Sequence, residues 1–187
     1  MADDTNGADA LKRYYFLRAF VSAVWVAAAF TVGAANPLVG GALLVLYPAW
    51  DAFANARDAA ANGGLRANLP QAFNTAVSSL VAAGVLAALN LDPRLVLVLF
   101  GVWAILAGVL QLAAGVRRWR TFGAQWAMVL SGAQSALAGG HFLSKAAGPL
   151  PASLAPVIAP YAAFGAFYFL VSAIALTVKA RRAAGPA

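Results

Sequence analysis

The stretch from residue 95 to residue 116 most constrains the fold of this chain, because its twenty-two residues include no charged side chain. A helix of that length is roughly 33 Å long, enough to cross a hydrocarbon core of about 30 Å. Inside a bilayer no water satisfies backbone groups, so a spanning segment must pair them internally, as a helix does. Arg117, Arg118 and Arg120 follow directly, and basic residues mark the cytoplasmic end of a span. The stretch therefore predicts a transmembrane helix and its orientation.

The rest of the composition agrees with a membrane protein. Of 187 residues, 63% are hydrophobic and 10% charged, whereas about a quarter are charged in a soluble domain. The formal charge of +7 comes from basic residues at the ends of apolar runs, which excludes a nucleic-acid-binding patch. There is no cysteine, which excludes disulfides and thiolate ligands. The N-terminus is acidic and polar, unlike the start of a signal peptide, so the first apolar run is expected to remain as a helix.

The apolar runs predict an all-α, polytopic fold with six transmembrane helices in one domain over residues 14–180. The expected helices cover residues 17–35, 38–56, 71–91, 95–116, 121–143 and 161–178. Residues 1–13 and 181–187 are expected to be cytoplasmic tails, the first of them disordered. A proline turn at Asn36-Pro37 connects the first two expected helices, and one at Asp92-Pro93 connects the third and fourth. Residues 57–70 and 145–160 are predicted loops.

The distribution of basic residues gives an independent test of six spans. With the N-terminus inside, the cytoplasmic side receives Lys12, Arg13, Arg18, Arg57, Arg66, Arg117, Arg118, Arg120, Lys179, Arg181 and Arg182. Only Arg94 and Lys145 fall outside. This positive-inside bias predicts a multi-pass membrane protein with both termini in the cytoplasm.

Similar residues recur at similar places along the chain, which predicts an internal repeat. Ser22, Ser78 and Ser135 are separated by 56 and 57 residues in the odd-numbered helices. The even-numbered helices carry aromatic pairs, namely Tyr47 with Trp50, Phe100 with Trp103 and Tyr161 with Phe164. Each expected hairpin begins and ends on the cytoplasmic side. The pattern therefore predicts three parallel helical hairpins of common origin.

The fifth predicted helix is unusually rich in small residues. Ser131, Ser135 and Gly139 recur at a spacing of four, and so do Gly132, Ala136 and Gly140. In lipid, such faces let helix backbones approach closely. Both faces are therefore expected to pack against neighbouring helices.

These features together resemble the HdeD-like short-repeat membrane proteins over about residues 14 to 180. The resemblance rests on Leu17-Arg18 opening the first helix, Asp51 in an aromatic second helix, and Phe100–Val116 followed by RRWR and a small-residue helix. It implies three two-helix repeats in a bacterial membrane. The family is largely of unknown molecular function, and its name-giving member is associated with acid resistance in the bacterial envelope. No catalytic residues come with the resemblance.

Arg18 and Asp51 are the candidate intramembrane ion pair. Arg18 lies seventeen residues before Ala35 and Asp51 sixteen residues after it, so antiparallel helices place both at one depth. An unpaired charge at that depth is expensive, which favours a direct pair that sets the register of the hairpin. A proton or ion relay through Asp51 is the alternative.

Other polar residues within the spans are candidates for packing or sensing. Asn74, Ser78, Gln111, Gln134 and Ser135 are expected to form polar contacts between helices. His141 is the only histidine and lies near the outer end of its helix, where a pH-sensitive role is one hypothesis and a plain interfacial position the other.

The chain has none of the common catalytic motifs. No HExxH, paired carboxylates within one span or cysteine ligand set occurs, so no catalytic, metal or cofactor site is expected. The favoured function is a non-enzymatic membrane protein related to envelope stress, whose partners are the bilayer and a second copy or another membrane protein. The alternative is a small channel or transporter with a polar pathway near Arg18 and Asp51. The channel or transporter hypothesis is favoured if the polar residues of the spans converge on one cavity.

Overall fold

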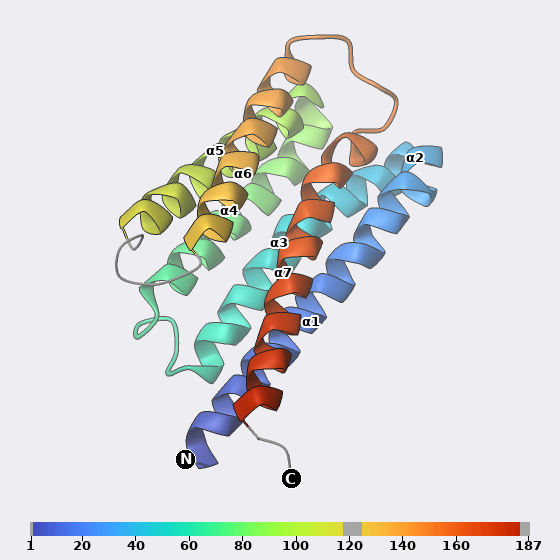
Figure 1. Ribbon diagram of the computed structural model, residues 1–187. Coiled ribbons are helices and arrows are strands. Elements are labelled where there is room, and N and C mark those ends of the chain that lie inside the picture. The colour runs from blue at the N-terminus through green and yellow to red at the C-terminus, as the bar shows by residue number, and fades with distance from the viewer. Residues whose placement is uncertain (1, 118–124, 184–187) are drawn as a thin grey trace.

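All secondary structure among the described residues is helical, which confirms the predicted all-α class (Figure 1). The computed structural model describes residues 2–117 and 125–183. The elements are α1 (Ala2–Phe30), α2 (Val32–Ala35), α3 (Pro37–Ala61), α4 (Leu69–Leu91), α5 (Arg94–Arg117), α6 (Gln125–Ala146) and α7 (Ala155–Ala183). Residues 118–120 of the basic cluster and the predicted start of the fifth span lie outside the described residues.

Five segments of the described chain are long and apolar enough to cross a membrane. They are Asp9–Ala35, Pro37–Ala61, Leu69–Leu91, Arg94–Ala113 and Ala155–Arg182. The helix expected to supply the sixth span, α6, is not among them. Its serines, glycines, Gln134 and His141 lower its hydropathy. Six spans therefore stay a prediction.

Several helices extend further than their sequence predicts. α1 begins at Ala2, where a disordered tail was expected, and Thr31 separates α1 from the short α2. α3 continues to Ala61, so the predicted loop over 57–70 shrinks to residues 62–68. Gly63 and Gly64 adopt positive φ there, which lets the chain turn sharply after α3.

The start of α7 also corrects the sequence interpretation. The predicted loop over 145–160 ends at Ala155, and both Pro156 and Pro160 are helical. Pro156 sits in the first turn, where a backbone N–H has no intrahelical acceptor and its loss costs nothing. Pro160 lies within the helix, a position that membrane helices tolerate when neighbours pack around the freed carbonyl.

Two predicted turns form as expected. Asn36 caps α3, and its side-chain oxygen accepts from the backbone N–H groups of Leu38 (2.9 Å) and Val39 (3.3 Å). Pro37 follows at the first helical position, where it is favoured. Asp92 accepts from the backbone N–H of Arg94 at 2.9 Å and so starts α5.

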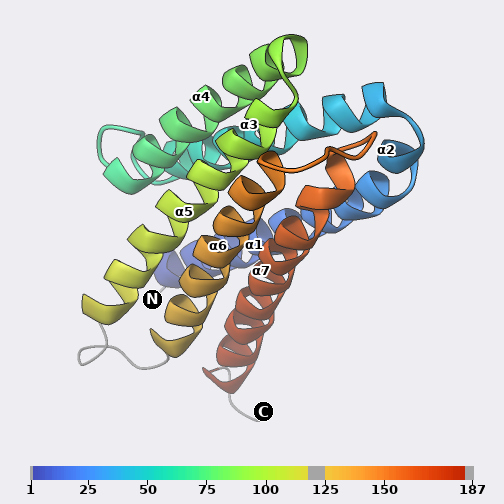
Figure 2. The same cartoon turned by 90° about the horizontal axis from the view of Figure 1, so that it is seen from above.

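The helices pack as three close pairs, namely α5 with α6, α1 with α7, and α3 with α4. Figures 1 and 2 show α5 and α6 lying side by side in both views, and Figure 1 shows α7 beside α1. The partners within each predicted hairpin, such as α1 and α3, touch much less. Close packing therefore joins each hairpin to the next, and α7 returns to α1.

Glycines allow the closest of these contacts, between α5 and α6. A Cβ added at Gly108 would lie 2.5 Å from the carbonyl oxygen of Gly132, and one at Gly139 would lie 2.5 Å from that of Gly101. The two predicted small-residue faces of α6 therefore pack against α5 over only part of their length. A Cβ at Gly140 would meet no described atom within 4 Å.

The hydrophobic core fills only the half of the bundle that lies away from the termini. Its largest fully buried side chains include Leu44, Val85, Leu97, Phe100 and Phe142. They lie near the start of α3 and α5 and near the end of α4 and α6, which meet at that end of the bundle. The half nearer the termini is packed differently and contains the candidate site.

Adding one methyl group at Gly108 tests the backbone contact between α5 and α6. We expect Gly108→Ala to lower the melting temperature, because the added carbon meets backbone atoms and overpacking costs about 1–3 kcal/mol. Gly140→Ala on α6 is the matched control and should leave the melting temperature unchanged. Equal melting temperatures for the two variants in detergent would contradict the contact.

Candidate functional site

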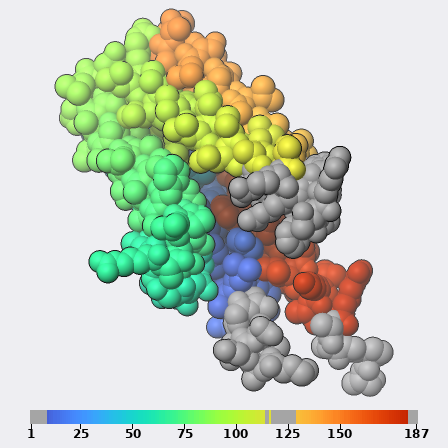
Figure 3. Space-filling view, turned by 90° about the vertical axis from the view of Figure 1, so that its left-hand side faces the viewer, coloured from blue at the N-terminus to red at the C-terminus, as the bar shows by residue number. Residues whose placement is uncertain are grey.

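A polar cavity of about 440 Å³ occupies the half of the bundle near the termini. Six helices contribute to its wall. Its lining residues include Tyr14, Arg18, Tyr47, Asp51, Asn55, Asp58, Gln71, Asn74, Trp103, Gln111, Ser131, Gln134, Ser135, Tyr161 and Tyr168. Figure 3 shows the molecule hollowed between α4 and α5, with atoms of α1 and α7 visible behind them. An amide- and hydroxyl-lined cavity inside a membrane bundle is suited to water or a polar solute.

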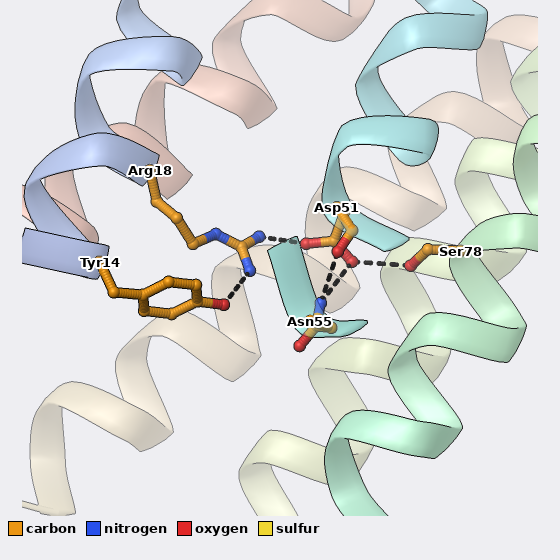
Figure 4. A network of polar contacts seen from close by, with 5 residues as sticks. All are labelled: Tyr14, Arg18, Asp51, Asn55 and Ser78. Atoms are coloured by element: carbon orange, nitrogen blue, oxygen red, sulfur yellow. Dashed lines mark hydrogen bonds and ion pairs between the residues drawn. The ribbon is translucent and has the colours of Figure 1, made fainter. Parts of the chain in front are cut away.

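Arg18 and Asp51 meet in the wall of this cavity (Figure 4). Arg18 Nη2 donates to Asp51 Oδ1 and forms an ion pair that joins α1 to α3. The side chains are 11% and 21% exposed, so both charges are largely removed from solvent. Two charges in such a position offset their desolvation only when they pair and hydrogen-bond well.

The second oxygen of Asp51 binds two further donors. Ser78 Oγ donates to Asp51 Oδ2 at 2.7 Å, and Asn55 Nδ2 donates to the same atom at 3.1 Å. Because Ser78 lies on α4, the carboxylate of Asp51 connects three helices (Figure 4). Both oxygens are occupied, which fixes the position of the carboxylate.

Arg18 is held by two more groups besides Asp51. Its Nη1 donates to the Tyr14 hydroxyl at 2.9 Å, and the guanidinium carbon lies 4.3 Å from the ring centroid of Phe169 on α7. The second contact is a cation–π interaction at short range. Arg18 Nε is buried without an acceptor among the described residues. The guanidinium therefore ties α1 to both α3 and α7.

The structure brings most of the other predicted polar residues to the same cavity. Asn74, Gln111, Gln134 and Ser135 line it, and Ser78 reaches it through Asp51. Gln134 accepts a hydrogen bond from the Tyr168 hydroxyl, which joins α6 to α7. Ser135 donates to the Ala104 carbonyl at 2.9 Å and thereby joins α6 to α5. His141 is exposed at the other end of α6 and lies outside the cavity lining.

Sequence reasoning missed several lining residues, some of which left a signal. Tyr14 and Asn55 each lie four residues from a charged partner, the spacing that places side chains together on a helix. Asp58 was assigned to a loop, yet it lies on α3 and accepts from Gln71 Nε2 at 3.0 Å. The sequence shows no pattern that would direct Tyr168 inward.

Aromatic rings close the end of the cavity that faces the hydrophobic core, away from the termini. The rings of Tyr47 and Trp103 lie 6.1 Å apart in an edge-to-face arrangement, and Tyr47 lies 6.5 Å from Phe100 in the core. Tyr161 packs edge-on against Phe142 at 6.0 Å. These rings separate the polar cavity from the opposite end of the bundle, where the hydrophobic core begins.

The site offers hydrogen-bonding groups rather than reactive ones. Among the described residues there is no group of three His, Cys, Asp or Glu side chains placed to hold a metal ion. The carboxylate of Asp51 is neutralised by Arg18 and already accepts three hydrogen bonds. What the arrangement can do is bind a small polar molecule through amides and hydroxyls.

Comparison with known proteins gives no further assignment. No model of a known protein family, no curated protein and no solved structure matches this chain. The HdeD-like resemblance therefore remains an expectation from the sequence pattern, and the site has to be interpreted from its geometry.

A double-mutant cycle tests the ion pair. We expect Arg18→Gln or Asp51→Asn alone to lower stability by about 3–5 kcal/mol, because each leaves a buried charge without its partner. The double variant should recover much of that loss, since two amides can still hydrogen-bond. The measurement is the melting temperature in detergent for the four proteins of the cycle.

The same cycle separates a structural pair from a relay. A relay predicts that Asp51→Asn keeps its stability while any proton-linked phenotype is lost. Additive losses, with no coupling between the two positions, would contradict a direct pair in the folded protein.

Proposed function

We propose that this chain is a non-enzymatic membrane protein that admits a small polar solute to its cavity and conducts it across the bilayer. The observation that supports this function is the convergence of intramembrane polar residues on one cavity. Scattered polar residues would have favoured a role in helix packing alone. Ligand sites between the helices of a bundle are common, and polar groups within a membrane mark solute or ion pathways.

The proposal includes six spans and an orientation. Its membrane is a bacterial plasma membrane, and its termini and the cavity mouth face the cytoplasm. The excess of basic residues at the ends of the chain and of the helices supports that orientation. At the opposite end, Arg94 donates to the carbonyls of Ala146 (2.9 Å) and Gly148 (2.6 Å), so one of the two outward basic residues has a structural role at the end of α6.

The proposal also includes three repeats that surround the cavity. Tyr47, Trp103 and Tyr161 come from the second helix of the three expected hairpins, and all three line the cavity. Tyr47 and Tyr161 hold equivalent places in the repeat, whereas Trp103 is the counterpart of Trp50. The second helix of each hairpin packs most closely on the first helix of the next, with α7 closing on α1. A ring of equivalent hairpins accounts for this packing.

The solute class follows from the lining. Amide and hydroxyl groups dominate it, and the Arg18–Asp51 pair contributes no net charge. Asp58 adds one carboxylate, which accepts from the amide of Gln71. A small solute with both donors and acceptors is therefore favoured over a large apolar one. Passage requires the aromatic floor at Tyr47, Trp103 and Tyr161 to part, because those rings close the cavity toward the hydrophobic core.

Solute entry into proteoliposomes tests the function. We expect urea, glycerol or glycine to enter vesicles containing the native protein faster than protein-free vesicles, measured as stopped-flow light scattering after osmotic shock. Asn74→Leu should slow that entry severalfold, because it replaces a polar lining group by an apolar one.

Asn90→Leu is the matched control. Asn90 is an exposed asparagine on the same helix, and its amide bonds locally to the Leu86 carbonyl at 2.9 Å. It should leave entry unchanged. The proposal fails if all three solutes enter no faster than in protein-free vesicles, or if the two variants slow entry equally.

A further inference from the structure

A long groove separates α1 from α3 on the outside of the bundle, and the polar cavity does not account for it. α1 packs mainly on α7 and α3 mainly on α4, so the two helices leave a space between them, called here the α1–α3 seam. The seam has two parts of about 410 Å³ and 650 Å³ that share Trp50 and Phe53. The two hollows therefore lie next to each other along the seam.

The two parts of the seam differ in chemistry. The part nearer the middle of the bundle is lined almost entirely by apolar side chains, including Val21, Val24, Leu43, Leu46 and Phe53. The part nearer the termini contains Arg13 and Arg57, both exposed, together with Asp58. These two arginines face one carboxylate, that of Asp58, which also accepts from Gln71 of α4. The groove is apolar at one end and basic at the other.

A polar group without a partner lies where the two parts meet. Trp50 Nε1 is buried and has no acceptor among the described residues. Trp50 lines both parts of the seam. A buried N–H without an acceptor destabilises the folded protein, so an acceptor supplied by a bound molecule would remove that penalty.

The length of the seam matches one leaflet. From Ala28 to Arg13 along α1 is about 22 Å at 1.5 Å per residue. Half of a bilayer with its headgroups is about 20–22 Å thick. A transmembrane helix of a second copy would need a groove along the whole span, whereas one lipid needs only this length.

We propose that the α1–α3 seam binds one phospholipid with an anionic headgroup, taken from the leaflet on the side of the termini. The acyl chains lie on Val21, Val24, Leu43 and Leu46. With a turn of the indole toward the groove, an ester carbonyl accepts from Trp50 Nε1, which is closed off from solvent in the lipid-free chain. The phosphate lies between Arg13 and Arg57. The apolar lining, the indole N–H and the basic side chains thus follow one another along the seam in the same order as the acyl chains, the esters and the phosphate along the lipid.

Lipid titration of the delipidated full chain in detergent, followed by native mass spectrometry, tests this site. We expect one molecule of dioleoylphosphatidylglycerol to bind more tightly than dioleoylphosphatidylcholine. Arg13→Gln and Arg57→Gln should each weaken phosphatidylglycerol binding about fivefold, as expected for one basic residue at an anionic lipid surface. Arg66→Gln, in the exposed loop at the same end, is the matched control and should change nothing.

Trp50→Phe tests the contribution of the indole N–H separately from that of the two arginines. It keeps an aromatic ring but removes the N–H donor, so it should weaken both lipids by a similar factor. Equal binding of the two lipids by the native chain would overturn the proposal, and so would arginine variants that behave like Arg66→Gln. A lipid-free dimer held together through the seam would also overturn it, since a second copy would then be the occupant.

Discussion

The carboxylate of Asp51 is the interaction on which the arrangement of this bundle most depends. One oxygen pairs with Arg18 of α1 and the other accepts from Ser78 of α4, while Asp51 itself belongs to α3. Through Arg18 the connection continues to Phe169 of α7. A largely buried carboxylate is costly without its partners, so these contacts hold the four helices at one depth.

That polar connection lies where the bundle is not filled by side chains. The half away from the termini has a continuous apolar core, where the α5 and α6 backbones come close through Gly101 and Gly139. The other half encloses the cavity. One end thus supplies packing stability, while the other leaves hydrogen-bonding groups free to meet a solute. The aromatic rings at Tyr47, Trp103 and Tyr161 form the boundary between them.

Much of the fold could be predicted because membrane helices leave simple signals. Apolar length located the helices, the Asn36-Pro37 turn was correct, and equal spacing from that turn placed Arg18 and Asp51 at one depth. The start of α7 could not be predicted, because prolines that usually end helices are tolerated at its first turn and among neighbours.

The sequence could not predict that the polar residues of different helices line one cavity. Helices that are apolar on nearly every side have no strong amphipathic pattern to fix which face turns inward. Asn74 and Gln134 were therefore recognisable as polar but not as neighbours of one space. Local spacing would have revealed Tyr14 and Asn55, whereas Tyr168 depends on how α7 packs.

On the proposed function, water enters the bundle from the end that holds both termini, and the absence of native cysteine makes this entry measurable. Single cysteines introduced as Asn74→Cys and Gln111→Cys should react with a membrane-impermeant maleimide applied on that side, because only a hydrated thiol ionises to the reactive thiolate. Leu80→Cys, on the exposed apolar surface of α4, and Val85→Cys, in the core, should stay unlabelled. Labelling of Asn74→Cys or Gln111→Cys only from the opposite side, or of neither from any side, would contradict the account.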